Sequence, residues 1–263
     1  MRVSEDRRYR EANAEAWTVL SRKGYDRTRD SLNTPAFMHL LGRVRGRKGL
    51  DVGCGEGHNT RLAARRGAQM TAIDISEIFI RHAREAEAGE PLGIRYLRSS
   101  GEKLPFRNRV FDFAMATMSL MDMAGQERVL REVHRVLRPG GFFQFSMVHP
   151  CFATPKWFWL RDESGRKTGL VVGDYFRRLN GEPEEWIFGA APEVLKRRFP
   201  KFRIPRFTRT LSGWLNLVID AGFDLERLVE PTPTDAVLRK YPDMYDARII
   251  AYSLIVRGRK RKR

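Results

Sequence analysis

Residues 50–57 have the composition of a turn that binds a nucleoside. They read Leu-Asp-Val-Gly-Cys-Gly-Glu-Gly, a short apolar strand that runs into glycines directly before a predicted helix at 58–66. Glycines allow the backbone to approach a ligand closely, and the first turn of a helix offers free N–H groups to an anion. Asp74 ends a second apolar run about 20 residues later, where a carboxylate in a doubly wound sheet accepts hydrogen bonds from ribose hydroxyls.

The spacing of the glycines separates two kinds of ligand. Dinucleotide-binding turns use G-x-G-x-x-G. Here Gly53, Gly55 and Gly57 form G-x-G-x-G, and His58 stands where the third dinucleotide glycine would be. Residues 53–60 also contain no Lys or Arg, which a phosphate cradle would use. We therefore expect a single carboxylate, rather than a pyrophosphate, at the start of this helix. S-adenosylmethionine has such a carboxylate and an adenosine.

At these residues the sequence resembles the class I S-adenosylmethionine-dependent methyltransferases, whose first motif reads (L/V)-(D/E)-x-G-x-G-x-G. The nearest group is the bacterial small-molecule methyltransferases, such as those of quinone and natural-product biosynthesis. The resemblance implies a seven-stranded, doubly wound sheet and S-adenosylmethionine as the cofactor. Within the first motif and the strand after it, the implied cofactor residues are Asp51, Gly53, Cys54, Gly55 and Asp74.

A second block, Gly-Glu-Lys-Leu-Pro-Phe at 101–106, matches the part of the family that surrounds the adenine. The residue before this block is normally acidic and holds the adenine amino group. Here it is Ser100, a departure that leaves one hydroxyl as the acceptor. The resemblance also implies that Gly101 and Glu102 lie at the adenine edge. Ile75 matches the apolar residue that flanks the adenine ring.

The predicted fourth strand, 110–116, leads to the edge where the reactive end of the cofactor lies in this family. The resemblance implies that Thr117 and Met118 flank its methionine portion. Asp122 is the first ionisable group beyond this edge. It either faces the acceptor as a base or hydrogen-bond partner, or stabilises the start of the next helix. The Asp/Asn-Pro-Pro-aromatic signature of nucleic-acid N-methyltransferases is absent here.

His149 closes the predicted fifth strand, at the edge where doubly wound sheets place substrate. A histidine there can take a proton from a hydroxyl or amine as the methyl arrives. The alternative is a histidine held by loop backbone. The neighbouring Pro-Cys pair at Cys151 also occurs in cytosine-C5 methyltransferases, which use a cysteine nucleophile, but no matching acidic motif accompanies it. No cluster has metal-ligand spacing, so we expect no metal.

The pattern along the chain predicts the elements that position these residues. Apolar runs alternate with amphipathic stretches, which is typical of a parallel sheet covered by helices. The predicted strands are 48–53, 69–74, 93–98, 110–116, 142–148, 223–229 and 249–256. The predicted helices are 5–23, one capped by Thr34, 58–66, one from Ser76 to residue 88, 125–137 and 211–221. The last two strands fit the antiparallel hairpin that ends the family's sheet.

We divide the chain into five parts: an N-terminal helical lid at 1–46, a cofactor-binding core at 47–149, a substrate-lid insertion at 150–209, a C-terminal helix with the hairpin at 210–256, and a basic tail at 257–263. The insertion is irregular and rich in aromatic residues, which favours a lid over an organic acceptor. A self-packed insertion or a subunit contact is the alternative. In the N-terminal lid, Arg22 and Tyr25 either contact the cofactor or pack on the surface.

Composition limits the class of protein. The 263 residues are 42% hydrophobic, enough for a full core. No apolar run is long enough to span a membrane and no signal segment begins the chain, so we expect a cytoplasmic protein without a membrane partner. The net charge is +17, and six of the last seven residues are basic. This charge indicates either a nucleic-acid partner or an Arg-rich, solvated surface and tail.

These observations predict an enzyme that transfers a methyl group to an O, N or C atom of a small organic acceptor by direct displacement. The alternative is an RNA methyltransferase that uses the Arg-rich surface. No aromatic-basic motif for reading RNA accompanies the charge. A third interpretation, a binding module without cofactor, is disfavoured by the intact glycine turn and Asp74.

Overall fold

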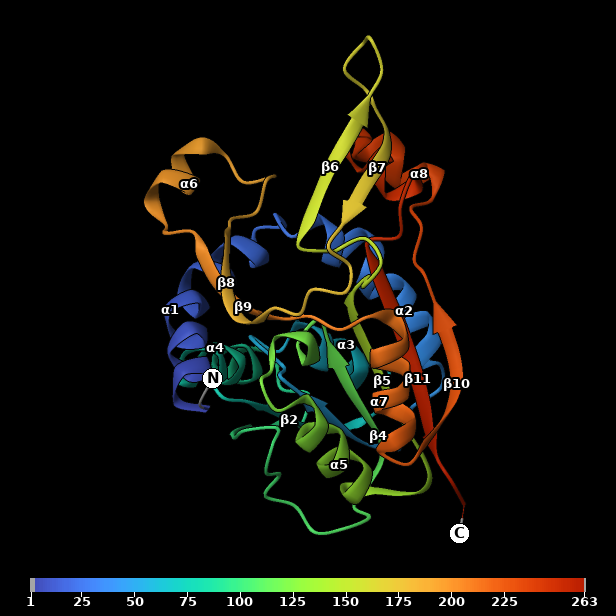
Figure 1. Ribbon diagram of the computed structural model, residues 1–263. Helices are drawn as coiled ribbons and strands as arrows, with labels where there is room; N and C mark the ends of the chain where they lie inside the picture. Colours follow the sequence, from blue (N-terminus) through green and yellow to red (C-terminus); the bar gives the residue numbers. More distant parts are fainter. Residues whose placement is uncertain (1–2, 263) are drawn as a thin grey trace.

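The computed structural model describes residues 3–262 and centres on one seven-stranded sheet (Figure 1). The strand order is β10-β11-β5-β4-β1-β2-β3. The strands are β1 (Lys48–Val52), β2 (Gln69–Asp74), β3 (Arg95–Arg98), β4 (Phe111–Thr117), β5 (Leu137–Val148), β10 (Phe223–Val229) and β11 (Ser253–Lys260). The first five are parallel, and β11 runs antiparallel to both β5 and β10. The predicted doubly wound sheet with a terminal antiparallel pair is confirmed.

Helices cover both faces of the sheet because both faces of its central strands are apolar. Along β4, Phe113 and Met115 pack into a cluster with α2 (Thr34–Leu41), α3 (His58–Arg65) and α4 (Glu77–Gly89). The alternate residues Ala114 and Ala116 pack into a second cluster with α5 (Gln126–Val136) and α7 (Leu211–Asp220). This alternation is the period of two expected for a strand buried on both faces.

A third, smaller core joins the N-terminal helix to the insertion. Helix α1 (Val3–Arg22) lies beside β8 (Asn180–Trp186) and β9 (Phe202–Phe207), as Figure 1 shows. The ring centroid of Trp17 lies 5.3 Å from that of Trp186, 5.0 Å from that of Phe188 and 4.9 Å from that of Phe202. Aromatic contacts of this geometry stabilise the pair beyond simple burial. The α1–β8–β9 unit therefore forms a rigid roof over the carboxyl ends of the strands.

The insertion is more regular than the sequence predicted. It contains two antiparallel hairpins, β8–β9 and the pair β6 (Lys156–Arg161) and β7 (Lys167–Gly173), with the short helix α6 (Glu193–Arg198) between β8 and β9. Trp, Phe and Val favour the extended conformation. Asp162 Oδ1 accepts hydrogen bonds from the backbone N–H groups of Ser164 and Arg166, which closes the β6–β7 turn.

Three sequence-based boundaries were wrong. The strand predicted at 142–148 begins at Leu137, directly after α5. Thr34 does not cap its helix, because a π-helix, η1 (Arg29–Asn33), runs directly into α2, and Thr34 Oγ1 bonds to Asn59 instead. The last strand begins at Ser253, after α8 (Asp235–Lys240) and the 3-10 helix η3 (Pro242–Arg248), and it continues to Lys260. The basic tail expected from residue 257 is therefore sheet as far as Lys260, since β11 is bonded on both sides.

Candidate functional site

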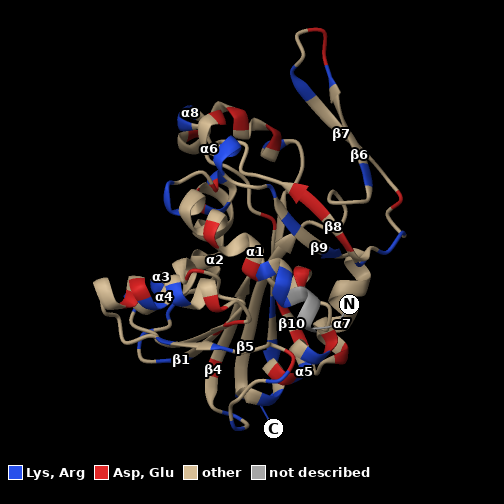
Figure 2. Ribbon diagram, turned by 90° about the vertical axis from the view of Figure 1, so that its left-hand side faces the viewer, with Lys and Arg blue, Asp and Glu red and all other residues tan. Residues whose placement is uncertain are grey.

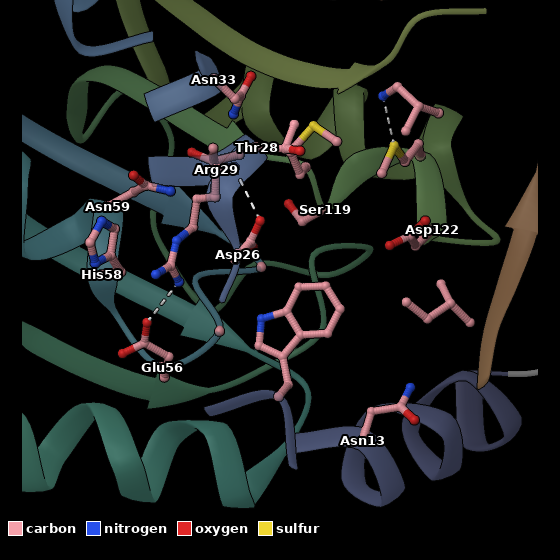
Figure 3. A pocket seen from close by; sticks show the side chains of 18 of the residues that line it. Asn13, Asp26, Thr28, Arg29, Asn33, Glu56, His58, Asn59, Ser119 and Asp122 are labelled. Atoms are coloured by element: carbon pink, nitrogen blue, oxygen red, sulfur yellow. Dashed lines mark hydrogen bonds and ion pairs between the residues drawn. The ribbon is translucent and has the colours of Figure 1, made fainter. Parts of the chain in front are cut away.

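A cavity of about 700 Å³ lies at the carboxyl ends of β1, β2, β4 and β5. Its floor is the sheet edge with the glycine turn, and its roof is the α1–β8–β9 unit. The segment that joins α1 to α2 forms a third wall, to which Asp26, Arg29 and Asn33 contribute. Figure 3 shows Arg29 of this segment reaching Glu56 of the glycine turn. A space of this size is in the upper part of the range of about 300–1,000 Å³ for small-molecule sites.

The glycine turn packs so closely at Gly53 that no side chain fits there. The N–H groups of Gly53 and Cys54 both donate to the Ile73 carbonyl, at 2.8 and 3.0 Å. A Cβ on Gly53 would lie 2.7 Å from the Cβ of Ser119, and the φ of Gly53 is +74°. Gly55 has a φ of +55° and lines the cavity without a neighbouring side chain. The turn thus presents bare backbone to the cavity, as a cofactor cradle requires.

Asp74 is fixed by this turn. Its Oδ2 accepts a hydrogen bond from the Gly55 N–H at 2.9 Å, and its Oδ1 accepts one from the Ser76 N–H at 2.9 Å. The carboxylate lies on the cavity wall at the end of β2. Two backbone bonds hold it in one orientation, which is the arrangement expected of a group that receives a pair of ribose hydroxyls.

Asp51 lies beneath the turn and is absent from the cavity wall. Its Oδ2 accepts a hydrogen bond from Thr60 Oγ1 at 2.6 Å. Burial, together with the smaller effect of the negative charge of Asp74, raises the pKa of the Asp51 carboxyl to about 7. The sequence grouped Asp51 with the cofactor residues, but in the fold its contact is with helix α3, so it supports the turn from below.

The residues expected at the adenine lie together on one wall of the cavity. Ile75, Ser100, Gly101 and Glu102 all line it. Ser100 Oγ accepts a hydrogen bond from the Glu102 N–H at 3.2 Å. The Glu102 carboxylate pairs with Arg128 at 2.5 Å, so its charge is compensated from outside the cavity.

Thr117 and Met118 also line the cavity, at the end of β4. Met118 has a φ of +52°, a left-handed conformation that is rare for a residue with a side chain. Its N–H donates to the Ser146 carbonyl at 3.0 Å, which holds the strained backbone in place. Such strain concentrates at functional sites. The strained backbone at Met118 therefore lies at the edge where the reactive end of the cofactor was expected.

Asp122 lines the cavity, but its carboxylate forms an ion pair with an arginine of the roof. Arg10, from helix α1, lies 3.3 Å from Asp122 Oδ2 and donates to the Asp122 carbonyl at 2.9 Å. The contact ties the roof to the end of β4. The two interpretations of Asp122, a helix start and a group facing the acceptor, do not include this partner, because Arg10 is 112 residues away in the chain.

His149 is separate from the cavity. Its side chain is buried, and its Nε2 lies 2.8 Å from Glu230 Oε1, while its Nδ1 accepts a hydrogen bond from the Cys151 N–H. It does not line the cavity, and neither does Cys151. The expectation of an acceptor base at His149 is therefore corrected: the strand end turns it away, toward the loop after β10, and the loop backbone holds it.

Sequence reasoning missed the residues of the segment between α1 and α2. Arg29 Nη1 lies 3.3 Å from Glu56 Oε1, so a cation does reach the glycine turn, from outside the motif (Figure 3). Asp26 lines the cavity, and its Oδ1 accepts a hydrogen bond from the Arg29 N–H at 3.0 Å. Burial raises the pKa of Asp26 to about 6. The charged run Tyr-Asp-Arg-Thr-Arg at 25–29 could have indicated these residues, although only Tyr25 was considered as a contact to the cofactor.

Of the two N-terminal residues that were singled out, Tyr25 lines the cavity. Arg22 does not, but its Nε lies 3.3 Å from Glu56 Oε2 and its Nη2 donates to the His82 carbonyl. It therefore fastens the end of α1 to the glycine turn.

Only one half of the insertion reaches the cavity. Trp186, Ile187, Phe188 and Ile204 line it from the β8–β9 side. No residue of the β6–β7 hairpin does, although Trp157, Phe158 and Trp159 belong to the aromatic run that indicated a lid. Within residues 3–262, no three His, Cys, Asp or Glu side chains are grouped so that they could hold a metal ion, and no helix is long and apolar enough to cross a membrane.

Comparison with known proteins agrees with this geometry. Residues 50–145 match the family described as "Methyltransferase domain". A demethylmenaquinone methyltransferase of Tropheryma whipplei is 34% identical over 178 residues, which cover 62% of this chain and 73% of that protein. The solved structure of an S-adenosylmethionine dependent methyltransferase from Mesorhizobium loti is 30% identical with a TM-score of 0.69, over 86% of this chain and 96% of the other.

The chain belongs to the class I S-adenosylmethionine-dependent methyltransferases. Its cofactor is S-adenosylmethionine. The methyltransferase also resembles the malonyl-[acyl-carrier protein] O-methyltransferase of Pectobacterium atrosepticum, at 32% identity over 126 residues. That match covers 47% of this chain and 48% of the relative, so the chain spans about half the length of this curated relative.

Proposed function

We propose that this methyltransferase transfers the methyl group of S-adenosylmethionine to an O, N or C atom of a small organic acceptor. The observation that carries the proposal is the single cavity of about 700 Å³, which extends from the glycine turn to the aromatic roof. One end has the backbone and carboxylate of a nucleoside site, and the other end has apolar rings. A cofactor and an organic acceptor can therefore meet in one continuous space.

The cofactor end is assigned as follows. Gly53, Cys54 and Gly55 offer bare backbone to the methionine portion, with the Arg29 guanidinium beside the turn as the cation for its carboxylate. Asp74 receives the ribose hydroxyls. Asp51 supports the turn without contact. The remaining assigned residues lie along the adenine and the reactive end: Ile75, Ser100, Gly101, Glu102, Thr117 and Met118.

The acceptor end is assigned to the roof and to the wall formed by the segment between α1 and α2. Trp17, Trp186 and Phe188 supply apolar surface for an organic ring or chain. Asp26 supplies a carboxylate. Similar proteins support an organic acceptor, since they are named as methyltransferases of malonyl-[acyl-carrier protein], of a fatty acid and of demethylmenaquinone.

The bound cofactor supplies a methyl group that is already electrophilic, so the protein's part is to align the acceptor with it and to exclude water. Orientation of this kind contributes roughly 7–11 kcal/mol. If the acceptor carries a proton, Asp26 is the carboxylate placed to take it. Asp122 also lines the cavity, but Arg10 neutralises it. The raised pKa of Asp26, about 6, leaves this carboxyl ionised at neutral pH with useful basicity.

Helix α1, the segment after it and the β8–β9 half of the insertion act together as the lid. Two contacts attach it to the floor: Arg10 to Asp122 and Arg22 to Glu56.

The RNA alternative has no structural support. The basic residues Arg257, Arg259 and Arg261 pair with Gln144, Glu226 and Asp224 beside their strands, rather than forming a solvated tail.

The cofactor assignment is tested by substitution of Asp74. We expect Asp74→Ala to weaken S-adenosylmethionine binding at least about tenfold in titration calorimetry, because a charge-assisted hydrogen bond to each hydroxyl is lost. Asp74→Asn, which keeps one acceptor oxygen for the backbone N–H groups, separates loss of binding from damage to the turn. Asp220→Ala, at an exposed carboxylate on α7, is the matched control. Unchanged affinity in both Asp74 variants would refute the assignment.

A further inference from the structure

The exposed apolar residues of this protein are concentrated in one projecting element. Ten large apolar side chains are exposed in the described part of the chain, and six of these lie between residues 157 and 176. Five belong to the β6–β7 hairpin, and Phe176, which follows it, is 83% exposed. Figure 1 shows the hairpin extending from the body of the molecule, at the end of the sheet that carries the cavity. Single exposed apolar residues need no explanation, but a contiguous group marks an interaction site.

The hairpin is apolar on both faces. Residues paired across an antiparallel ribbon point to the same side. Phe158 pairs with Val171, and these two side chains, 55% and 36% exposed, lie on one face. Trp157 pairs with Val172, and these, 52% and 40% exposed, lie on the other. None of residues 156–173 belongs to any of the four apolar clusters formed by the described residues. A two-stranded ribbon without such support is marginally stable in water.

Basic side chains border the apolar ones. Lys156 and Arg161 stand at the two ends of β6, Arg166 precedes β7, and Lys167 is its first residue. Figure 2 shows this arrangement, with the acidic pair Asp162–Glu163 confined to the turn. The Asp162 carboxylate stabilises this turn, because its Oδ1 accepts hydrogen bonds from the Ser164 and Arg166 N–H groups. The whole chain carries a net charge of +17, so its long-range field also favours an anionic surface.

We propose that the β6–β7 hairpin docks this methyltransferase on the surface of an anionic phospholipid bilayer. Trp and Phe favour the boundary between acyl chains and headgroups, and Lys and Arg beside them bind anionic headgroups. A protein partner with a flat surface covers one face of a ribbon at a time, whereas lipid surrounds an inserted ribbon on both. The two-sided exposure of Trp157 and Phe158 therefore favours lipid over a second copy of the chain.

The hairpin is also connected to the cavity. Lys167 forms an ion pair with Asp246, which lines the cavity, and its ammonium lies 4.4 Å from the centre of the Trp159 ring. Docking through the hairpin therefore holds the cavity-bearing end of the sheet at the membrane surface. No spanning helix is needed for this mode of binding. The lack of a membrane-spanning segment, from which no membrane partner was expected, does not bear on binding at the membrane surface.

The test is co-sedimentation of the full chain with large vesicles. One set contains phosphatidylcholine alone, and the other has one quarter of it replaced by phosphatidylglycerol. We expect binding to the anionic vesicles, weakened by about 0.5 M NaCl because the charges are then screened. The double variant Trp157→Ser, Phe158→Ser should bind at least about tenfold more weakly, since two buried aromatic rings are lost. Ile219→Ser, at a residue 50% exposed on α7, is the matched control and should bind like the wild type.

Two further measurements keep the proposal falsifiable. Lipids with brominated acyl chains should quench the tryptophan fluorescence of the wild type, and Trp157→Phe should remove much of that quenching. The proposal is overturned if the wild type co-sediments with neither vesicle set, or if the double variant binds as well as the wild type. A gel-filtration result in which the wild type is a dimer and the double variant a monomer without vesicle binding also overturns it. Cofactor binding without vesicles reports on the proposed function separately, because the hairpin does not line the cavity.

Discussion

The two hairpins of the insertion share aromatic residues but differ in environment. Both β6–β7 and β8–β9 carry tryptophan and phenylalanine on short antiparallel strands. In β8–β9, Phe202 is 1% exposed and packs with Trp186 against Trp17 of helix α1. In β6–β7, Trp157 and Phe158 are more than half exposed. The difference lies in the partner, because α1 lies along one hairpin and no apolar cluster of the described residues includes the other.

The comparison shows that aromatic content does not assign a role by itself. Tryptophan and phenylalanine form the roof of a site in the hairpin that a distant helix covers. In the hairpin without such a helix they form a projecting surface. The covering helix is about 170 residues away in sequence from β8, and its contact with the hairpin is decided by the fold. Experiments on either hairpin should therefore affect different properties.

The largest difference should appear in stability. Phe202→Ala removes a buried ring and leaves a cavity in the roof, so we expect it to lower the free energy of unfolding by about 3–5 kcal/mol. Phe158→Ala should change it by less than about 0.5 kcal/mol, since the ring is exposed. Urea titration followed by circular dichroism measures both. Equal effects would mean that β6–β7 is packed in solution, contrary to the comparison drawn between the hairpins.

A second prediction concerns the segment that joins the roof to the floor. Arg29→Gln should weaken S-adenosylmethionine binding by about tenfold, equivalent to about 1.4 kcal/mol, because the cation beside the glycine turn is lost. Arg81→Gln, in an exposed pair with Glu15, is the control and should bind normally. If the two variants bind equally well in calorimetry, Arg29 serves only to hold Glu56.

The floor should also differ from both hairpins in its response to pH. Asp51 has a pKa raised to about 7 by burial, so the folded state holds its proton more tightly than the unfolded state. The stability from this group is complete below the unfolded value and is lost as pH rises through about 7. Relative to the wild type, Asp51→Asn should gain about 1 kcal/mol between about pH 6 and pH 8.5.

The effect of Phe202→Ala should be the same across that range, because no charge is involved. Chemical unfolding at several pH values measures the two variants side by side. A constant difference between Asp51→Asn and the wild type would show that Asp51 titrates normally in the fold.

The smallest effect is expected from removing the exposed hairpin. Replacement of residues 157–172 by a short Gly-Ser turn should leave cofactor affinity unchanged in calorimetry, since no residue of this stretch lines the cavity. Loss of affinity would place the hairpin over the site and make the two hairpins parts of one lid.

The cofactor end of the site was predictable because its signals are local. The glycines, Asp74 and the block at 100–102 act through backbone conformation and short spacing, and all but Asp51 line the cavity as expected. The other end of the cavity was predictable only in part. A lid from the N-terminal segment and from the insertion was expected, but which of their side chains line the cavity depends on contacts between distant stretches. His149 illustrates the limit: its position at the end of β5 was right, but the direction of its side chain depends on Glu230, 81 residues later.

The sequence by itself determined the doubly wound sheet, the glycine turn and the family, because alternation of apolar runs and close backbone contacts are written in adjacent residues. Tertiary structure alone decided that Arg29 reaches the glycine turn, that Arg10 neutralises Asp122, and that one hairpin is a roof while the other is exposed. These outcomes depend on which surfaces meet when the chain closes. Contacts between segments that are far apart leave no periodic pattern in either one.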